Sequence, residues 1–143
     1  MTSLWNFDLN GNSTFDGCSE DECDNFGSLS ALPVVGDWNS TGLEEIGLFL
    51  PDSGTWQLDL NGNGSWDGCR RMDKCFKGFG QTGDLPVVGD WDGTGNVRIG
   101  VYRPSTGEWF FDMNGNGKWD NCTADACLGP FGQPGDLPVV GKW

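Results

Sequence analysis

The chain has 143 residues, a net charge of −13 and 36% hydrophobic residues, with 24 Gly, 8 Trp and 9 Phe. Disordered chains are poor in aromatic residues, so this composition indicates a folded domain. Nucleic acids require a basic surface, and the acidic excess argues against them as partners. No apolar stretch approaches the length of a membrane span, and the N-terminal residues lack the features of a signal peptide.

An internal repeat of roughly fifty residues organises the chain. Each copy contains Trp, then Asp-x-Asn-Gly-Asn, a pair of Cys, Phe-Gly and Leu-Pro-Val-Val-Gly. A further element, Asp-Trp followed by Ile-Gly, links the copies and occurs only twice, at 37–47 and 90–100. We predict a single repeat domain over 1–143, with copies at 5–55, 56–108 and, in part, 109–143.

The expected secondary structure is all-β, because no segment has helical periodicity over about ten residues. Short apolar segments bounded by Gly and Pro are typical of strands joined by tight turns. Residues 98–102 and 108–111 are predicted to form a hairpin around the Pro-Ser-Thr-Gly turn at 104–107. Residues 137–140 are predicted to form a third strand, with Pro138 at its start or on a sheet edge.

The repeat resembles the bacterial FG-GAP and VCBS repeats, which form blades of integrin-α-like β-propellers. The resemblance rests on Phe-Gly, Gly-Asp-Leu-Pro-Val-Val-Gly-Asp-Trp-Asp-Gly-Thr-Gly and Ile-Gly-Val-Tyr-Arg-Pro-Ser-Thr-Gly within residues 79–109, and on a variant of this pattern in 26–56. It implies tandem propeller-blade-like units in a secreted or cell-surface protein, with calcium in the blade loops and a role in adhesion or structure.

The number of copies departs from that family, because fewer than three blades cannot close a propeller. We therefore expect an incomplete ring, or an open or stacked array that other subunits complete, unless the chain is a fragment. Strand pairing between subunits would give a homo-oligomer, and head-to-tail contacts that do not close would give a filament.

Each Asp-x-Asn-Gly-Asn segment begins a loop with oxygen-bearing side chains at positions 1, 3, 5 and 9. The same spacing begins an EF-hand calcium loop, in which position 7 supplies its backbone carbonyl. We predict three Ca²⁺ sites with these ligands: Asp8, Asn10, Asn12, Thr14 and Asp16; Asp59, Asn61, Asn63, Ser65 and Asp67; Asp112, Asn114, Asn116, Lys118 and Asp120. The alternative is that Asn-Gly-Asn only forms a hairpin turn.

No copy has the Glu that closes an EF-hand loop at position 12. Each has an Asp two residues before its second Cys, and we expect these residues to supply the closing carboxylate: Asp21, Asp73 and Asp125. A weaker metal site of similar spacing is predicted at Asp37, Asn39, Thr41 and Glu45. Its counterpart at Asp90, Asp92 and Thr94 has Arg98 at the last position, where the cationic side chain or water would replace the ion.

The six Cys form one pair per copy, which predicts three local disulfides: Cys18–Cys23, Cys69–Cys75 and Cys122–Cys127. Zinc is the alternative, although the chain has no His and the Cys spacing differs from that of usual zinc motifs. Disulfides imply an oxidising compartment, so we expect an extracellular or cell-surface protein. Asn121, in an expected exposed turn, is the best placed N-glycosylation acceptor.

No catalytic constellation is visible, because the chain has no His and no acid pair outside the repeated loops. We predict that the protein is not an enzyme but a calcium-binding structural repeat protein that assembles into a filament or surface structure. The alternative is an adhesin or a carbohydrate-binding propeller segment, in which exposed Trp would stack on a glycan. Core packing is the expected role of most of the Trp residues.

Overall fold

The computed structural model describes residues 4–70 and 72–142. These residues form ten β-strands and no helix, which confirms the all-β prediction. The strands are β1 (Leu4–Phe7), β2 (Glu22–Asn25), β3 (Leu32–Gly36), β4 (Glu45–Leu50), β5 (Thr55–Leu58), β6 (Lys74–Lys77), β7 (Leu85–Gly89), β8 (Arg98–Arg103), β9 (Glu108–Phe111) and β10 (Ala126–Leu128).

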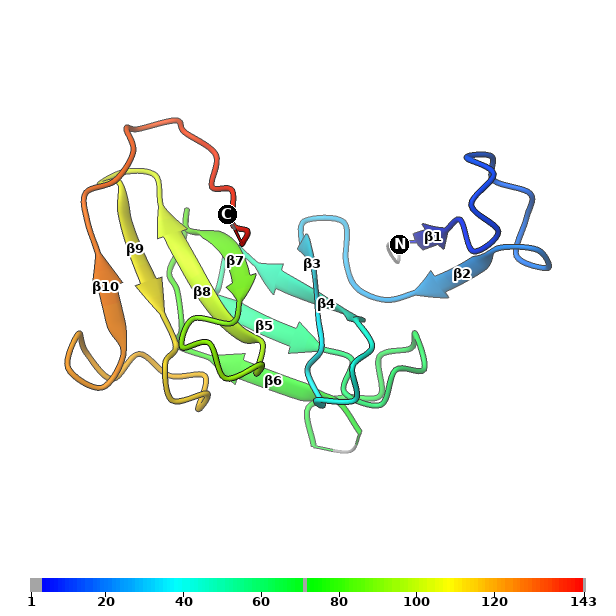
Figure 1. The fold of residues 1–143 in the computed structure, drawn as a ribbon, viewed down its shortest axis with the longest axis horizontal. Helices are drawn as coiled ribbons and strands as arrows, with labels where there is room; N and C mark the ends of the chain where they lie inside the picture. The colour runs from blue at the N-terminus through cyan, green and yellow to red at the C-terminus, as the bar shows by residue number, and fades with distance from the viewer. Residues whose placement is uncertain (1–3, 71, 143) are drawn as a thin grey trace.

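The strands form three antiparallel sheets, which follow one another along the longest axis of the molecule (Figure 1). β1 and β2 form a two-stranded sheet at one end, and the other two sheets have the orders β3-β4-β5-β6 and β10-β9-β8-β7. The four-stranded sheets share one register, with Val34 opposite Gly47 in the first and Val87 opposite Gly100 in the second. Each of these sheets starts in one sequence copy and ends in the next, and the described residues form no closed ring.

The predicted hairpin is confirmed by the pairing of β8 with β9. Its turn places Gly107 at φ 74°, and the Gly107 N–H donates to the carbonyl of Arg103 at 2.8 Å.

The prediction for residues 137–140 is wrong, because they form no strand. β3 and β7 each pair with the strand that follows them, and within the described part of the third copy no such strand is available. Without a partner, the backbone groups of 137–140 cannot join a ladder.

The outer strands β2, β6 and β10 are not expected from the sequence. Each contains the second Cys of a copy, and β6 (Lys-Cys-Phe-Lys) shows the charged composition of an edge strand. The predicted disulfides are confirmed, and each ties an outer strand to the preceding loop: Cys18–Cys23, Cys69–Cys75 and Cys122–Cys127.

The main hydrophobic core joins the two four-stranded sheets and consists of Phe49, Trp56, Leu58, Phe79, Ile99 and Val101. A smaller cluster, Phe26, Ile46 and Leu48, packs against residues of the β1–β2 sheet. One Trp contact recurs in all three copies, as the indole N–H donates to a Phe carbonyl in the pairs Trp5–Phe26, Trp56–Phe79 and Trp109–Phe131. These Trp residues therefore have a structural role.

A bidentate ion pair lies near the edge of the main core. Arg103 Nε and Nη2 donate to the two carboxylate oxygens of Asp84 at 2.9 and 3.0 Å, and Asp84 is buried. Removal of Arg103 would leave the buried carboxylate of Asp84 without its hydrogen-bond donor and without a compensating positive charge, which destabilises the folded state. Since Arg103 is itself partly exposed, we expect Arg103→Ala to lower the free energy of unfolding by about 2 kcal/mol. Urea unfolding measures this change, and Lys77→Ala, in an exposed strand position, should be near neutral.

Candidate calcium-binding loops

The three Asn-Gly-Asn loops, residues 8–16, 59–67 and 112–120, begin directly after β1, β5 and β9. In the second and third loops the first Asp also extends the sheet. The N–H of Asp59 donates to Ile46 and that of Asp112 to Ile99, both at 3.1 Å. Asp59 and Asp112 are each 1% exposed, whereas Asp8 is exposed, because among the described residues no strand other than β2 pairs with β1.

The first carboxylate of each loop shapes the turn through backbone hydrogen bonds. In the second loop, Asp59 Oδ1 accepts from the N–H of Gly62 at 2.8 Å, and Oδ2 accepts from that of Gly64 at 2.7 Å. The bonds recur at corresponding positions in the other loops, from Gly11 and Ser13 to Asp8 and from Gly115 and Gly117 to Asp112. Both oxygens of this residue therefore direct the loop backbone around the carboxylate.

The side chains at positions 3, 5 and 9 converge on one place. In the second loop, Asp67 Oδ2 accepts hydrogen bonds from the amides of Asn61 and Asn63 at 2.9 and 2.8 Å. The Asn oxygens accept from the N–H groups two residues later in the chain, at 3.0 and 2.8 Å. The other two loops repeat the convergence on Asp16 and Asp120.

This arrangement fits calcium by the chemistry of its donors. All the predicted ligand atoms are hard oxygens, which Ca²⁺ prefers. Each Asn amide now directs its NH₂ group at the Asp, and a rotation about its last torsion, which is broad and roughly two-fold, would present the oxygen instead. Within the described residues, no group of three or more His, Cys, Asp or Glu is placed to hold a metal. The predicted sites instead combine Asp with Asn.

Burial and hydrogen bonding have opposite effects on the carboxylates of the third loop. Burial raises the pKa of Asp112, and the N–H groups of Gly117 and Gly115 oppose that rise. At the other end of the loop, hydrogen bonds from Asn116 and Asn114 lower the pKa of Asp120. The converging side chains thus favour the anionic form of Asp120, the form that a cation requires.

The Asp residues predicted to close the sites have another role in the structure. Asp73 Oδ1 accepts from the N–H of Leu60 at 3.3 Å, and Oδ2 accepts from that of Asp67 at 2.6 Å. The same two bonds to loop backbone recur at Asp21 and Asp125. All three residues are buried, and burial raises the pKa of Asp73. Each carboxylate joins the two ends of its loop, so its direct bond to calcium stays a prediction.

Contacts between neighbouring copies were not expected from the sequence. Asp24 in β2 lies against the second loop, with its Oδ1 at the place that a Cβ on Gly64 would occupy. Burial raises the pKa of Asp24, as do the charges of Glu22 and Asp59. In the third loop the ring of Phe76 takes the same place, where a Cβ on Gly117 would lie. The spacing of Asp24 and Phe76 after a Cys is the only sequence signal of this contact.

Position 6 of the first loop departs from the glycine of the other two. Ser13 has φ 65°, a left-handed conformation that costs a residue with a Cβ about 1 kcal/mol. Ser13→Gly should therefore raise the free energy of unfolding by about 0.5 kcal/mol after the greater entropy of the unfolded glycine chain is included. In Gly117→Ser the new Cβ would overlap the Phe76 ring, so a loss of more than about 1 kcal/mol is expected. Thermal melting of both variants in EDTA checks the contrast.

The two Asp-Trp loops, 37–45 and 90–98, lie beside the Asn-Gly-Asn loops. In the first, Asn39 Nδ2 donates to the carbonyl of Leu60 at 3.0 Å, and Thr41 Oγ1 donates to Glu45 at 3.4 Å. Asp37 accepts two N–H groups of its own loop. The four predicted residues of this weaker metal site are thus in one loop, but Glu45 is already bound to the N–H of Trp38 at 3.0 Å.

The second Asp-Trp loop contains its own cation. Arg98 Nη1 lies 2.7 Å from Asp92 Oδ2 and also donates to the carbonyl of Met113. The hydroxyl of Thr94 donates to Asp92, and this bond is the main reason that the pKa of Asp92 is lowered. Arg98 therefore supplies a positive charge beside the carboxylate of Asp92.

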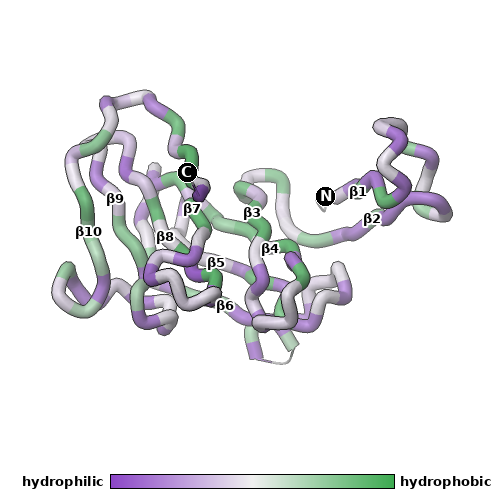
Figure 2. The backbone as a smooth tube through the Cα atoms, viewed as in Figure 1, coloured by the Kyte–Doolittle hydropathy of each residue, from purple (hydrophilic) through white to green (hydrophobic). Residues whose placement is uncertain are grey.

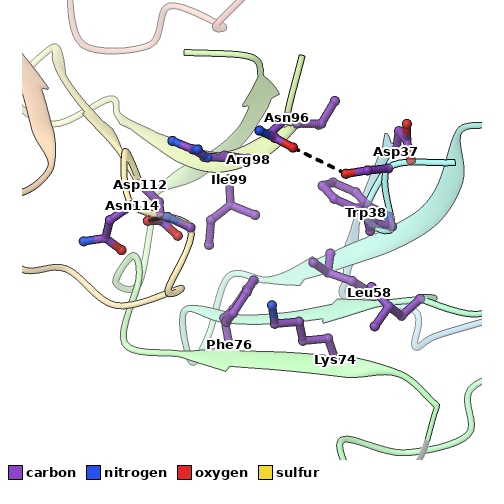
Figure 3. A pocket seen from close by; sticks show the side chains of 14 residues that line it. Asp37, Trp38, Leu58, Lys74, Phe76, Asn96, Arg98, Ile99, Asp112 and Asn114 are labelled. Atoms are coloured by element: carbon purple, nitrogen blue, oxygen red, sulfur yellow. Dashed lines mark hydrogen bonds between the residues drawn. The ribbon is translucent and has the colours of Figure 1, made fainter. Parts of the chain in front are cut away.

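A groove of about 240 Å³ lies between the two four-stranded sheets, beside the main core (Figure 3). Trp38, Leu58, Phe76 and Ile99 form its apolar walls, and Lys74, Arg98 and Asp112 give it mixed charge. Lys74 lies 4.6 Å from the centre of the Phe76 ring, so the ammonium group and the ring contact each other.

Asn121, the predicted glycosylation site, is exposed and has φ 83° in the turn before Cys122. This conformation agrees with the expected exposed turn, while glycosylation itself stays a prediction.

The chain matches no family model, no curated protein and no solved structure. Among the residues described, no helix is long and apolar enough to cross a membrane. The resemblance to FG-GAP and VCBS repeats therefore rests on the motifs quoted above.

Proposed function

We propose that this protein is an extracellular, calcium-binding structural repeat protein. The observation that carries the proposal is the recurrence of one loop design in three copies. In each, the first Asp holds the turn, and two Asn and a second Asp converge. A simple hairpin turn would not require the convergent side chains or the buried Asp that joins the ends of the loop.

Calcium would be held by the side chains at positions 1, 3, 5 and 9 and by the backbone carbonyl at position 7. When bound, it would supply positive charge among carboxylates that otherwise repel one another. Asp21, Asp73 and Asp125 position the loop backbone around that place. The modest number of carboxylates favours the moderate affinities of extracellular calcium modules.

The three disulfides and the absence of free Cys support secretion, since such bonds persist in oxidising compartments. Propeller-blade-like units of the FG-GAP and VCBS type account for the sequence motifs and for two sheets of equal topology. We infer a role as a subunit of a filament or surface structure, because the exposed apolar residues at 131–140 favour association with another chain.

Size-exclusion chromatography with light scattering, in calcium or in EDTA, tests the assembly role. Calcium at about 2 mM exceeds the dissociation constants of about 10⁻⁴–10⁻³ M that are typical of extracellular calcium modules. We expect concentration-dependent oligomers in calcium and smaller species in EDTA. A stable monomer in both buffers at all concentrations would contradict self-assembly.

The groove of Figure 3 favours glycan binding as a second candidate function, because Trp38 and Phe76 provide aromatic surface beside polar side chains. A glycan array would show sugar binding lost in Phe76→Ala if this function holds. No binding to any glycan would leave the structural role as the function.

A further inference from the structure

The outer strands β2, β6 and β10 occupy equivalent places in their sheets. Each pairs with the strand that begins its copy, and in each pair a Trp lies opposite the residue after the second Cys. These pairs are Trp5–Asp24, Trp56–Phe76 and Trp109–Leu128. Because the backbone positions agree, the differences between these strands lie in their side chains.

The side chains of these segments differ most in charge. The segment at 19–25, Ser-Glu-Asp-Glu-Cys-Asp-Asn, has four acidic residues and no basic one. The segment at 69–77, Cys-Arg-Arg-Met-Asp-Lys-Cys-Phe-Lys, has four of the eight basic residues of the chain. The segment at 122–128 has one charged residue, Asp125. Figure 2 shows that β2 is largely hydrophilic. Two equivalent strands of one chain therefore have opposite charge.

The acidic strand borders a cavity of about 340 Å³ between the β1–β2 sheet and the sheet that contains β4. Its apolar walls come from both sheets, and no described Lys or Arg lines it. Five residues with carboxylates line it: Glu22, Asp24, Glu44, Glu45 and Asp59. Burial and the charges of Glu22 and Asp59 raise the pKa of Asp24, so these carboxylates repel one another. The cavity therefore attracts a positive charge.

The groove between the two four-stranded sheets is the counterpart of this cavity, one copy further along the chain. At two positions it has a cation where the cavity has an acid, with Lys74 for Glu22 and Arg98 for Glu45 (Figure 3). Arg98 Nε and Glu45 Cγ lie 3.7 and 3.5 Å from the place that a Cβ would take on the first glycine of the adjacent Asn-Gly-Asn loop. This junction of the fold thus accepts cationic side chains, which the first junction lacks among its described residues.

The basic segment around β6 is available for contact with another molecule. Arg70, Lys74 and Lys77 are exposed. Neither salt bridge within the described part of the chain includes any of them. β6 is also the last strand of its sheet, so these side chains lie at a sheet edge. On a chain with net charge −13, this basic edge is complementary to the acidic surfaces of the same protein.

We propose that the acidic cavity beside β2 binds the basic edge of β6 from a second copy of the chain. The partner copy would contribute the positive charge that the first junction lacks and that Lys74 and Arg98 supply at the second. The occupant is a second copy because the chain has both members of a complementary pair, at equivalent places in successive sheets. Like charges exclude contacts between two β2 strands or two β6 strands. This inference rests on the assembly role proposed above and names its contact.

The two surfaces belong to different sheets of one molecule (Figure 1), so the contact is head-to-tail. A copy that binds a partner through its cavity still has a free basic edge, and its partner still has a free cavity. Repetition of such a contact gives a filament when the rotation between copies does not close a ring. The proposed contact therefore extends an assembly without a second kind of subunit.

Charge reversal tests this contact on the full chain in calcium, by light scattering over a range of protein concentrations. Glu22→Lys or Lys77→Glu alone should weaken self-association at least five-fold, because each places like charges opposite one another. An equal mixture of the two variants should regain wild-type association, since each then offers the other an opposite charge. The matched controls Asp52→Lys and Lys142→Glu change the net charge equally at exposed positions elsewhere and should associate like the wild type.

Carbodiimide cross-linking of a mixture of isotope-labelled and unlabelled protein locates the contact, because it joins amines to carboxylates that touch. Cross-links between copies should join Lys74 or Lys77 to Glu20 or Glu22. Salt at about 1 M should weaken the association, because it shortens the screening length to about 3 Å.

Wild-type oligomers that neither charge reversal weakens would overturn the proposal and leave the assembly role in place. A wild-type monomer at every concentration would overturn both. Variants that fail to associate even when mixed, with no cross-links between these segments, would assign the charges to another contact and also overturn the proposal. Melting in calcium and EDTA, measured on the same samples, reports the calcium function separately. Glu22 and Lys77 are exposed, so both variants should melt no lower than the wild type.

Discussion

Chelation of calcium by EDTA will lower the melting temperature of the protein by at least about 5 °C. A ligand that binds only the folded chain stabilises it by about 2.7 kcal/mol per site when its free concentration is 100 times the dissociation constant. For a chain of this length, each kcal/mol corresponds to roughly 2–4 °C. Because three loops are predicted, the full effect should exceed that of one site. Scanning calorimetry in calcium, in magnesium and in EDTA measures it.

Magnesium is the matched control, because its smaller ion requires a stricter octahedral geometry than these loops of Asn and Asp would impose. We expect the melting temperature in magnesium to lie near that in EDTA. Equal melting temperatures in calcium and EDTA would show that the loops hold their shape through their own hydrogen bonds alone.

Substitution of Asp67 and Asp73 will separate a ligand from a residue that positions the loop. Asp73→Asn leaves one acceptor oxygen for two N–H groups and directs an NH₂ group at the other N–H. A buried unsatisfied donor costs about 1–3 kcal/mol, so this variant should be less stable in EDTA as well as in calcium. Asp67→Asn keeps an oxygen for the two Asn amides, and its loss of stability should appear only in calcium. Urea unfolding in both buffers measures the four values.

The outcome for Asp73 decides between the two roles. If Asp73→Asn is as stable as the wild type in EDTA and less stable than the wild type only in calcium, Asp73 is a calcium ligand and its hydrogen bonds to the backbone contribute little to stability. The corresponding pair in the third loop, Asp120 and Asp125, provides an independent repeat of the comparison.

Much of the fold could be predicted from local patterns. The β8–β9 hairpin follows from β-branched residues, Pro104 and Gly107, and the disulfides follow from one Cys pair per copy. The outer strand β6 could not be predicted, because Lys-Cys-Phe-Lys has little strand character and depends on pairing with β5. Residues 137–140 show the opposite case. Their sequence is typical of a strand, but a segment without a partner strand does not form a ladder.

In the Asn-Gly-Asn loops, too, local features could be predicted from the sequence and contacts between distant residues could not. The spacing of the loop residues predicted a common direction for their side chains, and the structure brings Asn61, Asn63 and Asp67 together. The backbone bonds of Asp73 and the contact of Asp24 with Gly64 depend on residues far apart in the sequence, and no periodic pattern reports them.

Isothermal titration calorimetry of the EDTA-treated, dialysed protein with calcium tests the central claim most directly. The account predicts three sites per chain, with dissociation constants on the order of 10⁻⁴ M, in the range of extracellular modules. It also predicts two sites in Asp67→Asn, because that substitution removes one loop and leaves the others intact. The absence of calcium binding at millimolar concentration, or an unchanged stoichiometry in Asp67→Asn, would contradict it.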